Sequence, residues 1–303
     1  MLKDTMLYLA KQDGIRHFVS TNPATRRVAR RFVAGEALAE ALDVTRALNR
    51  QHISVTLDHL GENVADAAEA KAATQDYITI LDHICETELE ANISIKLTAL
   101  GLDVGEGLCQ ENLAALLQRA RDCDIFVRVD MEGSEYTQRT IEMVQVMHRE
   151  FENVGTVIQT MLYRSPDDIE RLIASKTRVR LVKGAYLEPP SVAFAKKADV
   201  DAQYVQLMHA LLARGTYPAI ATHDEKMIEE ARRFTAEQGI SRARFEFQML
   251  YGIRRDLQER LAREGYNVRV YVPYGTQWYP YLTRRMAERP ANLMFVAGNM
   301  FRG

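Results

Sequence analysis

Two adjacent arginines near the end of the chain are the residues whose type and spacing most clearly predict ligand binding. Arg284 and Arg285 lie in the stretch YVPYGTQWYPYLTRRMAERPAN, residues 271–292, and Glu288 follows them about one helical turn later. A guanidinium group donates two parallel hydrogen bonds to a carboxylate or phosphate, so the pair predicts a site for a small acid. On a helix, Glu288 lies on the same side as both arginines and can hold them in place. A surface ladder of ion pairs fits the same spacing.

Aromatic residues are concentrated beside this pair in the sequence. Their side chains supply apolar walls that exclude water from paired charges, and this favours a binding site over a surface ladder. They are Tyr271, Tyr274, Trp278, Tyr279 and Tyr281.

Short runs rich in β-branched residues alternate with helix-period segments from residue 54 onward. Each run predicts a strand, and each segment between two runs repeats apolar residues at helical spacing. Eight strand-then-helix units within about 250 residues predict an α/β fold, a (β/α)8 TIM-like barrel, whereas a doubly wound sheet usually has fewer strands. The predicted strands are residues 54–58, 93–97, 125–129, 156–161, 178–182, 218–222, 243–248 and 268–272.

The residues before the first strand predict helices that precede the barrel. Leu38, Leu42 and Leu48 fall on one stripe of such a helix. We expect this part to pack on the barrel as an arm or cap. No low-complexity segment or linker argues for a second folded domain beside the barrel. We divide the chain into an N-terminal helical arm, residues 1–50, and a barrel domain, residues 51–303.

Polar residues close almost every predicted strand. In a barrel of this kind the active site is built at the C-terminal ends of the strands, so these side chains should meet at one mouth. A single charged residue there is more often structural, and it is the concentration that indicates a site. The polar strand-end residues are Asp58, His59, Lys96, Arg128, Asp130, Gln159, Arg180, Lys183, Thr222, His223, Glu246, Gln248 and Tyr271.

The basic residues of this mouth predict an anionic ligand, since they would gather positive charge in one place. Asp130 and Glu288 are the expected partners of these bases. The bases are Lys96, Arg180, Lys183, Arg284 and Arg285.

The composition and the missing motifs argue against several classes of protein. Lys and Arg number 39 against 41 Asp and Glu, a net charge of −2, which shows no overall nucleic-acid footprint. The N-terminal MLKDTMLYLAKQDG contains acids and no long apolar run, so we expect no signal peptide, and no stretch approaches a membrane span. There is no HxH or HExxH pattern, so we predict no metal, and neither GxxxxGK[ST] nor GxSxG occurs.

The three cysteines predict a reduced, cytoplasmic protein. Cys85, Cys109 and Cys123 are odd in number and lack CxxC spacing. We therefore expect structural thiols.

Motifs at seven of the strand ends form a set that runs in order from about residue 54 to the C-terminus. The set resembles the proline dehydrogenases, in particular the short, single-function bacterial form. The motifs are SIKLTALG, VRVDMEGSEYT, VIQ, RVRLVKGAY, IATHDEKMI, FEFQMLYG and VRVYVPYGTQWYPYLTRRMAERPAN.

The resemblance implies an FAD-dependent oxidation of L-proline to Δ1-pyrroline-5-carboxylate, the first step of proline catabolism, in a distorted (β/α)8 barrel. Hydride would pass from C5 of proline to N5 of the flavin, and the electrons would go on to a membrane quinone. A cytoplasmic location is compatible with peripheral contact at the inner face of the membrane.

The motifs also carry over the residues expected to bind the substrate. Arg284, Arg285 and Lys96 would bind the carboxylate of proline. Glu288 would orient the two arginines, and Asp130 would pair with Lys96 or approach the amine. The residues expected to pack on the pyrrolidine ring are Tyr186, Leu250 and Tyr271.

The cofactor residues implied by the resemblance follow the strands in the middle of the chain. Arg180 is expected near N5, and we take it and Asp130 as the catalytic candidates. A cationic lining would favour the neutral amine, from which hydride leaves C5 most easily. The residues expected against the flavin are Met131, Gln159, Arg180, Lys183, Gly184, Ala185, Thr222 and His223.

Two other functions remain open from the residues themselves. Lys96 or Lys183 at a barrel strand end could be the amine nucleophile of a Schiff-base aldolase. A non-catalytic scaffold would need the polar mouth to be incidental.

Overall fold

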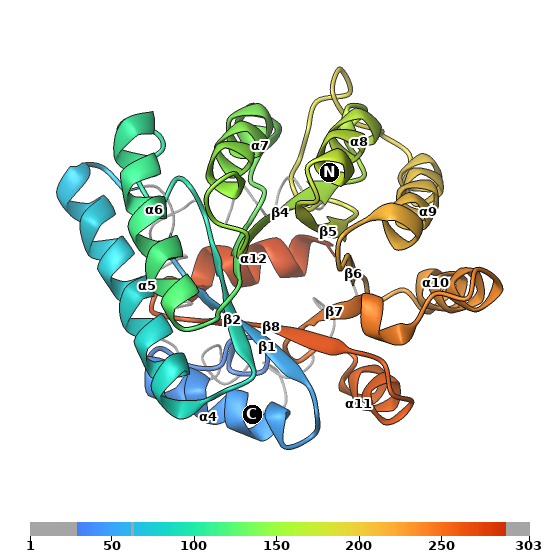
Figure 1. The fold of residues 1–303 in the computed structure, drawn as a ribbon, viewed down its shortest axis with the longest axis horizontal. Helices are drawn as coiled ribbons and strands as arrows, with labels where there is room; N and C mark the ends of the chain where they lie inside the picture. Colours follow the sequence, from blue (N-terminus) through green and yellow to red (C-terminus); the bar gives the residue numbers. More distant parts are fainter. Residues whose placement is uncertain (1–28, 62–63, 289–303) are drawn as a thin grey trace, which may run out of the picture.

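Eight parallel strands close into a barrel in the order in which they occur in the chain (Figure 1). The computed structural model describes residues 29–61 and 64–288. Each strand pairs with the next, and the last pairs with the first through Thr56 and Tyr271. The predicted (β/α)8 TIM-like fold is confirmed.

Every predicted strand is present, with its ends shifted by at most three residues. The strands are β1 (Ser54–His59), β2 (Ala91–Ile95), β3 (Val127–Val129), β4 (Val154–Gln159), β5 (Arg178–Val182), β6 (Ala219–Ala221), β7 (Glu246–Leu250) and β8 (Val268–Tyr274).

Helices follow the strands as the helical periodicity predicts. Asp224 caps α10, because its carboxylate accepts from the main-chain N–H of Lys226 at 3.2 Å. Ser165 is the first residue of α8, and its hydroxyl donates to the carbonyl of Gln159 at 2.6 Å. The described helices are α4 (Leu38–Asn49), α5 (Ala67–Thr87), α6 (Glu106–Asp122), α7 (Ser134–His148), α8 (Ser165–Ala174), α9 (Lys197–Arg214), α10 (Glu225–Glu237), the 3-10 turn η1 (Arg242–Arg244), α11 (Arg255–Arg263) and α12 (Trp278–Glu288).

The ring of helices departs from a regular barrel at its last position. The helix α4, which precedes β1, lies between α5 and α11 and contacts β1 and β8 (Figure 1). The helix α12, which follows β8, lies across the barrel in the view down its shortest axis (Figure 1). Arg284 and Arg285 belong to this last helix. The predicted domain boundary at residue 50 stays a prediction, and residues 1–28 lie outside the described part.

A short segment before α4 packs with α12. Its Ala29, Phe32 and Val33 are buried in one cluster with the α12 residues Trp278 and Leu282. The carbonyl of Gly35 accepts from the N–H of Gly275, just after β8, at 2.9 Å. The segment before α4 and the residues that follow β8 therefore lie together beside the C-terminal end of β8.

Polar side chains fill the interior of the barrel. Asp130 contacts Arg180 of β5, and Arg180 contacts Ser94 of β2 and Gln248 of β7. These strands are not neighbours, so the contacts must cross the interior. Barrels of this fold usually fill the interior with Val, Ile and Leu. Here the buried apolar residues of the strands pack with the helices, among them Val55, Leu57, Ile93, Ile95, Val127, Val129, Leu181, Phe247 and Val270.

A layer of charge lies toward the N-terminal ends of the strands. We call Arg128, Glu246 and Arg269 the base cluster. Arg269 Nε donates to Glu246 Oε2 at 3.0 Å, and its Nη1 donates to the carbonyl of Val55 at 2.8 Å. Arg128 Nη1 donates to the carbonyls of Thr156 and Arg178 at 2.9 and 2.7 Å. The main chain of the barrel thus takes up much of the hydrogen-bonding capacity of these arginines.

The cysteines differ from their prediction. Cys85 at the end of α5 and Cys123 after α6 form a disulfide, with Cα atoms 5.5 Å apart. The expectation of reduced thiols is wrong for this pair, because the parallel packing of α5 and α6 brings together residues that are 38 positions apart in the sequence. Cys109 is a buried free thiol, and burial raises its pKa to about 12.

Among the helices of residues 29–61 and 64–288, none combines the length and the apolar character needed to cross a membrane.

Candidate active site

Four buried residues and the half-buried Tyr271 form a set of polar contacts near the C-terminal ends of the strands. We call Asp58, Lys96, Asp130, Arg180 and Tyr271 the mouth cluster. Asp130 Oδ1 accepts from Arg180 Nη1 at 2.6 Å, and its Oδ2 accepts from the hydroxyl of Tyr271 at 2.8 Å. Lys96 Nζ donates to Asp58 Oδ1 at 3.1 Å. The cluster therefore consists of two ion pairs and a tyrosine, from strands around the whole barrel.

Arg180 is the most constrained member of the cluster. It is 5% exposed, and its Nε donates to Gln248 Oε1 at 2.5 Å. Its guanidinium lies over the ring of Tyr271, 5.3 Å from the ring centre. Burial, followed by the charges of Asp130 and Asp58, raises the pKa of Tyr271 well above its usual value, so the phenol stays a donor.

Asp58 has fewer partners than Asp130. It is 1% exposed, and its Oδ2 is buried without a hydrogen bond from any residue the structure describes. Burial raises the pKa of this carboxyl group, Lys96 and then the hydroxyl of Tyr271 act in the opposite direction, and the charge of Asp130 raises it further. A carboxylate with one cation and one acidic neighbour is the least stabilised charge of the cluster.

The residues predicted to contact a flavin lie after neighbouring strands of the barrel. Gln159 ends β4 and donates to the carbonyl of Glu132 at 2.8 Å. Lys183 follows β5, and its Nζ lies 2.6 Å from Asp201 Oδ1 and 3.2 Å from Asp224 Oδ2. Their roles stay predictions, and so do those of Met131, Arg180, Gly184, Ala185, Thr222 and His223.

Two of these residues have a conformation or a protonation state set by their surroundings. Gly184 has φ +113°, a conformation that side-chain-bearing residues rarely adopt, and a Cβ there would lie 2.3 Å from the sulfur of Met161. His223 Nε2 accepts from the main-chain N–H of Leu250 at 2.9 Å, which makes Nδ1 the protonated nitrogen of the neutral ring. Gly184 after β5 therefore has a defined backbone conformation, and His223 after β6 has a defined ring tautomer.

The residues predicted to bind substrate are brought together only in part. Tyr271 belongs to the mouth cluster, Leu250 ends β7 in register with it, and Tyr186 is half-buried after β5. Arg284, Arg285 and Glu288 lie in α12, but their side chains are outside the described part. Asp130 is expected to pair with Lys96 or to approach the amine. In the structure Arg180 reaches Asp130 across the barrel, and Asp58 on the neighbouring strand pairs with Lys96. The approach to the amine is therefore the role of Asp130 that stays a prediction.

Comparison with known proteins decides the family of this chain. The family model described as Proline dehydrogenase matches residues 41–298. The chain belongs to the proline dehydrogenase family. "Proline dehydrogenase 1" of Bacillus subtilis subsp. natto is 42% identical over 296 residues, 98% of each chain. The proline dehydrogenase of Deinococcus radiodurans is 43% identical over 281 residues, 91% of each chain.

The solved structures agree on the fold. Proline utilization A from Bdellovibrio bacteriovorus, inactivated by N-propargylglycine, superposes with a TM-score of 0.82 over 93% of this chain and 38% of the other, at 24% identity. The chain is therefore an oxidoreductase of the proline dehydrogenase family, as the sequence motifs predicted.

Membership of the proline dehydrogenase family gives no support to the aldolase alternative. Lys96 and Lys183 both lie in ion pairs. A nearby carboxylate favours the charged ammonium, whereas a Schiff-base nucleophile needs a neutral amine.

Sequence reasoning assigned no role to three residues that belong to the mouth cluster or contact it. Asp58 and Gln248 appeared only among the polar strand ends, and Ser94 was not singled out. The available signal was the period of two along the strands, since Thr56 and Asp58 alternate with buried Val55 and Leu57. That alternation predicts a polar interior for the whole strand and not only for its end.

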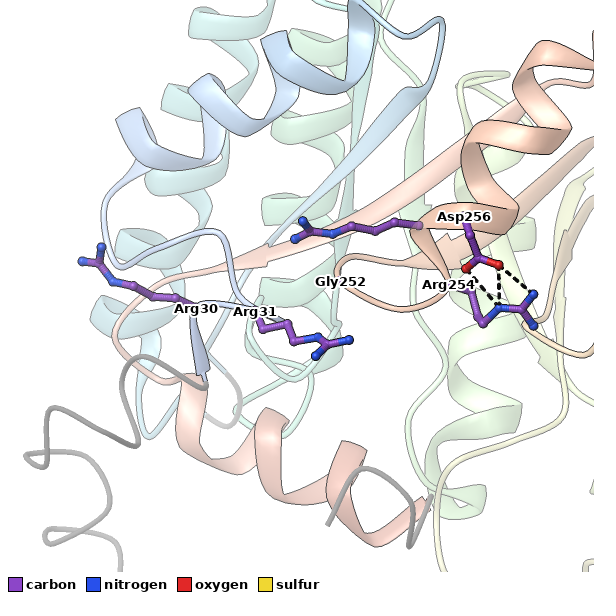
Figure 2. Close-up of a pocket in the computed structure, with 6 residues that line it drawn as sticks. Arg30, Arg31, Gly252, Arg254 and Asp256 are labelled. Carbon is purple, nitrogen blue, oxygen red and sulfur yellow. Dashed lines mark hydrogen bonds and ion pairs between the residues drawn. The ribbon is translucent and has the colours of Figure 1, made fainter. Parts of the chain in front are cut away.

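An arginine-lined cavity of about 650 Å³ lies outside the mouth cluster. It lies between the segment before α4 and the loop that joins β7 to α11, where Figure 2 shows Arg254 turned toward Asp256. Arg254 also lies 3.3 Å from Glu225, so its charge is balanced by acids. Among the lining residues that the structure describes, none is predicted to bind substrate or cofactor.

Within residues 29–61 and 64–288, no set of three or more His, Cys, Asp and Glu side chains is arranged to hold a metal ion.

Proposed function

We propose that this enzyme oxidises L-proline to Δ1-pyrroline-5-carboxylate with FAD as its cofactor, the first step of proline catabolism. The observation that carries the proposal is the mouth cluster inside a barrel of the proline dehydrogenase family, and we propose that Arg284 and Arg285 of α12 add two further cations to it. The family match supports the reaction, and the cluster supplies groups suited to a small amino acid.

The substrate carboxylate is bound by cations in this proposal. Lys96 contributes an ammonium that is 7% exposed. Arg284 and Arg285 add guanidinium groups from α12, and Glu288 orients them from the same helix. Tyr186, Leu250 and Tyr271 then form the apolar contacts of the ring.

The charge balance of the mouth explains why the α12 arginines matter. Lys96 is balanced by Asp58, and Arg180 is balanced by Asp130. The excess positive charge that favours an anionic carboxylate and a neutral amine must come from Arg284 and Arg285. Arg180 and Asp130 act as a fixed pair, since each has further hydrogen bonds that hold it in place.

The donor groups after β4, β5 and β6 suit a cofactor that carries a diphosphate. The ammonium of Lys183, the hydroxyl of Thr222 and the Nδ1–H of His223 can donate to phosphate or hydroxyl oxygens. Gly184 and Ala185 offer main chain with little side chain in the way, while Met131 and Gln159 line the strand ends next to them. FAD, when bound there, supplies the acceptor for the hydride that leaves C5 of proline.

We further propose that a membrane quinone is the electron acceptor. The enzyme would then work in the cytoplasm, in peripheral contact with the inner face of the membrane. No role for nucleic acid follows from its net charge of −2.

Replacing Arg284 and Arg180 separately tests the proposal. Arg284→Met should raise the KM for L-proline far more than it lowers the bound flavin content, because the loss of a charge-assisted pair costs about 2–4 kcal/mol of binding. Arg180→Ala should instead slow the bleaching of the flavin absorbance when proline is added without oxygen.

Arg263→Met, at an exposed arginine of α11, is the matched control and should change neither quantity. A colourless purified protein would contradict the cofactor, and an unchanged KM in Arg284→Met would remove that arginine from the site.

A further inference from the structure

Asp58 is a buried carboxylate that the proposed reaction does not yet use. It lies near the end of β1, opposite Ser94 of β2 in the register of the barrel. It is 1% exposed, yet the described residues give it one ion-pair partner, Lys96 at 3.1 Å. Its second carboxylate oxygen accepts no hydrogen bond from the described part of the chain.

This arrangement stabilises the fold poorly. A buried ion pair repays the cost of removing both charges from water only when further hydrogen bonds satisfy the remaining lone pairs. Asp130 meets that condition with Arg180, Ser94 and Tyr271 as donors. Asp58 does not. A charge that is kept in place at a cost to stability indicates a functional role.

The charged groups around Asp58 point to what that role is. Lys96 reaches it from β2, Asp130 acts on it from the end of β3, and Tyr271 acts from β8. The pKa values of Tyr77 in α5 and Tyr274 in β8 also respond to its charge. Among these groups of the described part of the chain, Lys96 is the cation. The negative charge of Asp58 therefore acts chiefly on the lysine ammonium.

We infer that Asp58 is a positioning residue, which holds the Lys96 ammonium in place and keeps it charged so that it can meet the carboxylate of the bound amino acid. The inference rests on the proposed role of Lys96 in binding proline. It goes beyond that role, because it makes the affinity for the carboxylate depend on a residue of another strand that need not touch the substrate. Removing Asp58 should weaken ground-state binding without altering the reacting atoms.

The first measurement is a double-mutant cycle between Asp58 and Lys96, with kcat and KM for L-proline measured with an artificial electron acceptor. D58N should raise KM about tenfold and leave kcat within about threefold of the wild-type value. The reason is that the lost contact stabilises the bound substrate and the transition state equally. K96M should raise KM by at least as much. The double variant D58N/K96M should match K96M alone, since Asp58 acts through the lysine.

The second measurement is the pH dependence of KM. A buried ammonium that loses its carboxylate partner favours its neutral form. The ratio of the KM of D58N to that of the wild type should therefore grow from about pH 7 to about pH 9. D58S, which also removes the charge and has a smaller side chain, provides a second variant should D58N not fold.

Binding of cyclopentanecarboxylate isolates the carboxylate contact from catalysis. This ligand has the ring and the acid group but no amine, so it binds without being oxidised. Its Kd, measured by equilibrium dialysis, should rise about tenfold in D58N. The matched control is D168N, which removes a carboxylate charge that is also 1% exposed and ion-paired, in α8 outside the barrel. D168N should lower the free energy of unfolding and leave the KM for L-proline and the Kd for cyclopentanecarboxylate unchanged.

The outcomes separate this inference from the proposed function. A wild-type KM in K96M would overturn the contact between Lys96 and proline, and the role of Asp58 with it. A raised KM in K96M with a wild-type KM in D58N and D58S would overturn the role of Asp58 alone. Additive effects in the double variant would show that Asp58 acts elsewhere and would reject the inference.

Discussion

The base cluster and the mouth cluster are two layers of buried charge in one barrel, and burial affects their carboxylates in opposite ways. Glu246 and Asp58 are 4% and 1% exposed. Burial alone would raise the pKa of Glu246, but Arg269, Gln248 and Arg128 outweigh it, and the pKa lies below its ordinary value. For Asp58, burial outweighs Lys96, and the pKa is raised.

The number of donors around each carboxylate explains the difference. Glu246 receives Arg269 on both oxygens, at 3.2 and 3.0 Å, and Arg269 is itself anchored to a main-chain carbonyl. Asp58 has Lys96 on one oxygen and a second oxygen without a partner among the described residues. A buried carboxylate with donors on both oxygens stabilises the fold, whereas one with an unsatisfied oxygen keeps hydrogen-bonding capacity for a ligand.

The largest effect that would test this comparison is on stability. E246Q leaves the buried Arg128 and the half-buried Arg269 without their carboxylate and should lower the free energy of unfolding by about 3–5 kcal/mol. D58N should cost less, about 1–2 kcal/mol, because the charge that it removes is already disfavoured. Urea unfolding monitored by circular dichroism measures both values. Equal losses of unfolding free energy in E246Q and D58N would show that the two clusters contribute equally to stability.

A glycine pair tests how the mouth is covered. Gly252 has φ +76°, and a Cβ there would lie 1.8 Å from the carbonyl oxygen of Arg31, in the segment beside α12. Gly239 has φ +63° with nothing within 4 Å of a Cβ. We expect G252A to lower the free energy of unfolding by about 2–3 kcal/mol. G239A should lower it by about 1 kcal/mol, from backbone strain alone.

The G252A and G239A variants also separate the two ends of the barrel. In G252A, the added Cβ should displace the segment before α4 from the β7–α11 loop and raise the KM for proline. Gly239 follows α10 on the outside of the barrel, so G239A should keep the wild-type KM. The same KM in both variants would mean that the segment does not shape the mouth.

The smallest effect expected is a difference in pH dependence. A carboxylate with a lowered pKa contributes stability that is present above its ordinary value, 4.5 for Glu246, and is lost as the pH falls through the lowered value. A carboxylate with a raised pKa does the reverse, so the charge of Asp58 costs stability as the pH rises above 3.8 through the raised value.

The stability deficit of E246Q relative to the wild type should therefore shrink in acid, by about 1 kcal/mol, and the deficit of D58N should shrink as the pH rises. Unfolding free energies measured from about pH 4 to about pH 7 test both trends. Parallel curves for the two variants would refute the contrast between the clusters.

How much of the structure could be predicted depends on how far along the chain each sequence pattern extends. Alternating runs such as RVRLV and helical stripes are local, so all eight strands and the barrel could be predicted. The positions of Lys96, Asp130, Arg180 and Tyr271 near the strand ends followed from the fold. Their partners did not follow, because the spacing of two residues in the sequence gives no distance across a barrel.

The sequence by itself determined the fold class, the family and the polar character of the mouth, since these depend on residue types repeated within short segments. Only the tertiary structure decided that Asp58 pairs with Lys96 over 38 positions, Arg180 with Asp130 over 50 and Tyr271 with Asp130 over 141. It also decided that Cys85 meets Cys123 and that α4 takes a place in the helix ring while α12 crosses the barrel. The three pairs across the barrel depend on the curvature of a closed sheet, and the disulfide depends on the packing of neighbouring helices, so both bring together segments that are distant in the sequence.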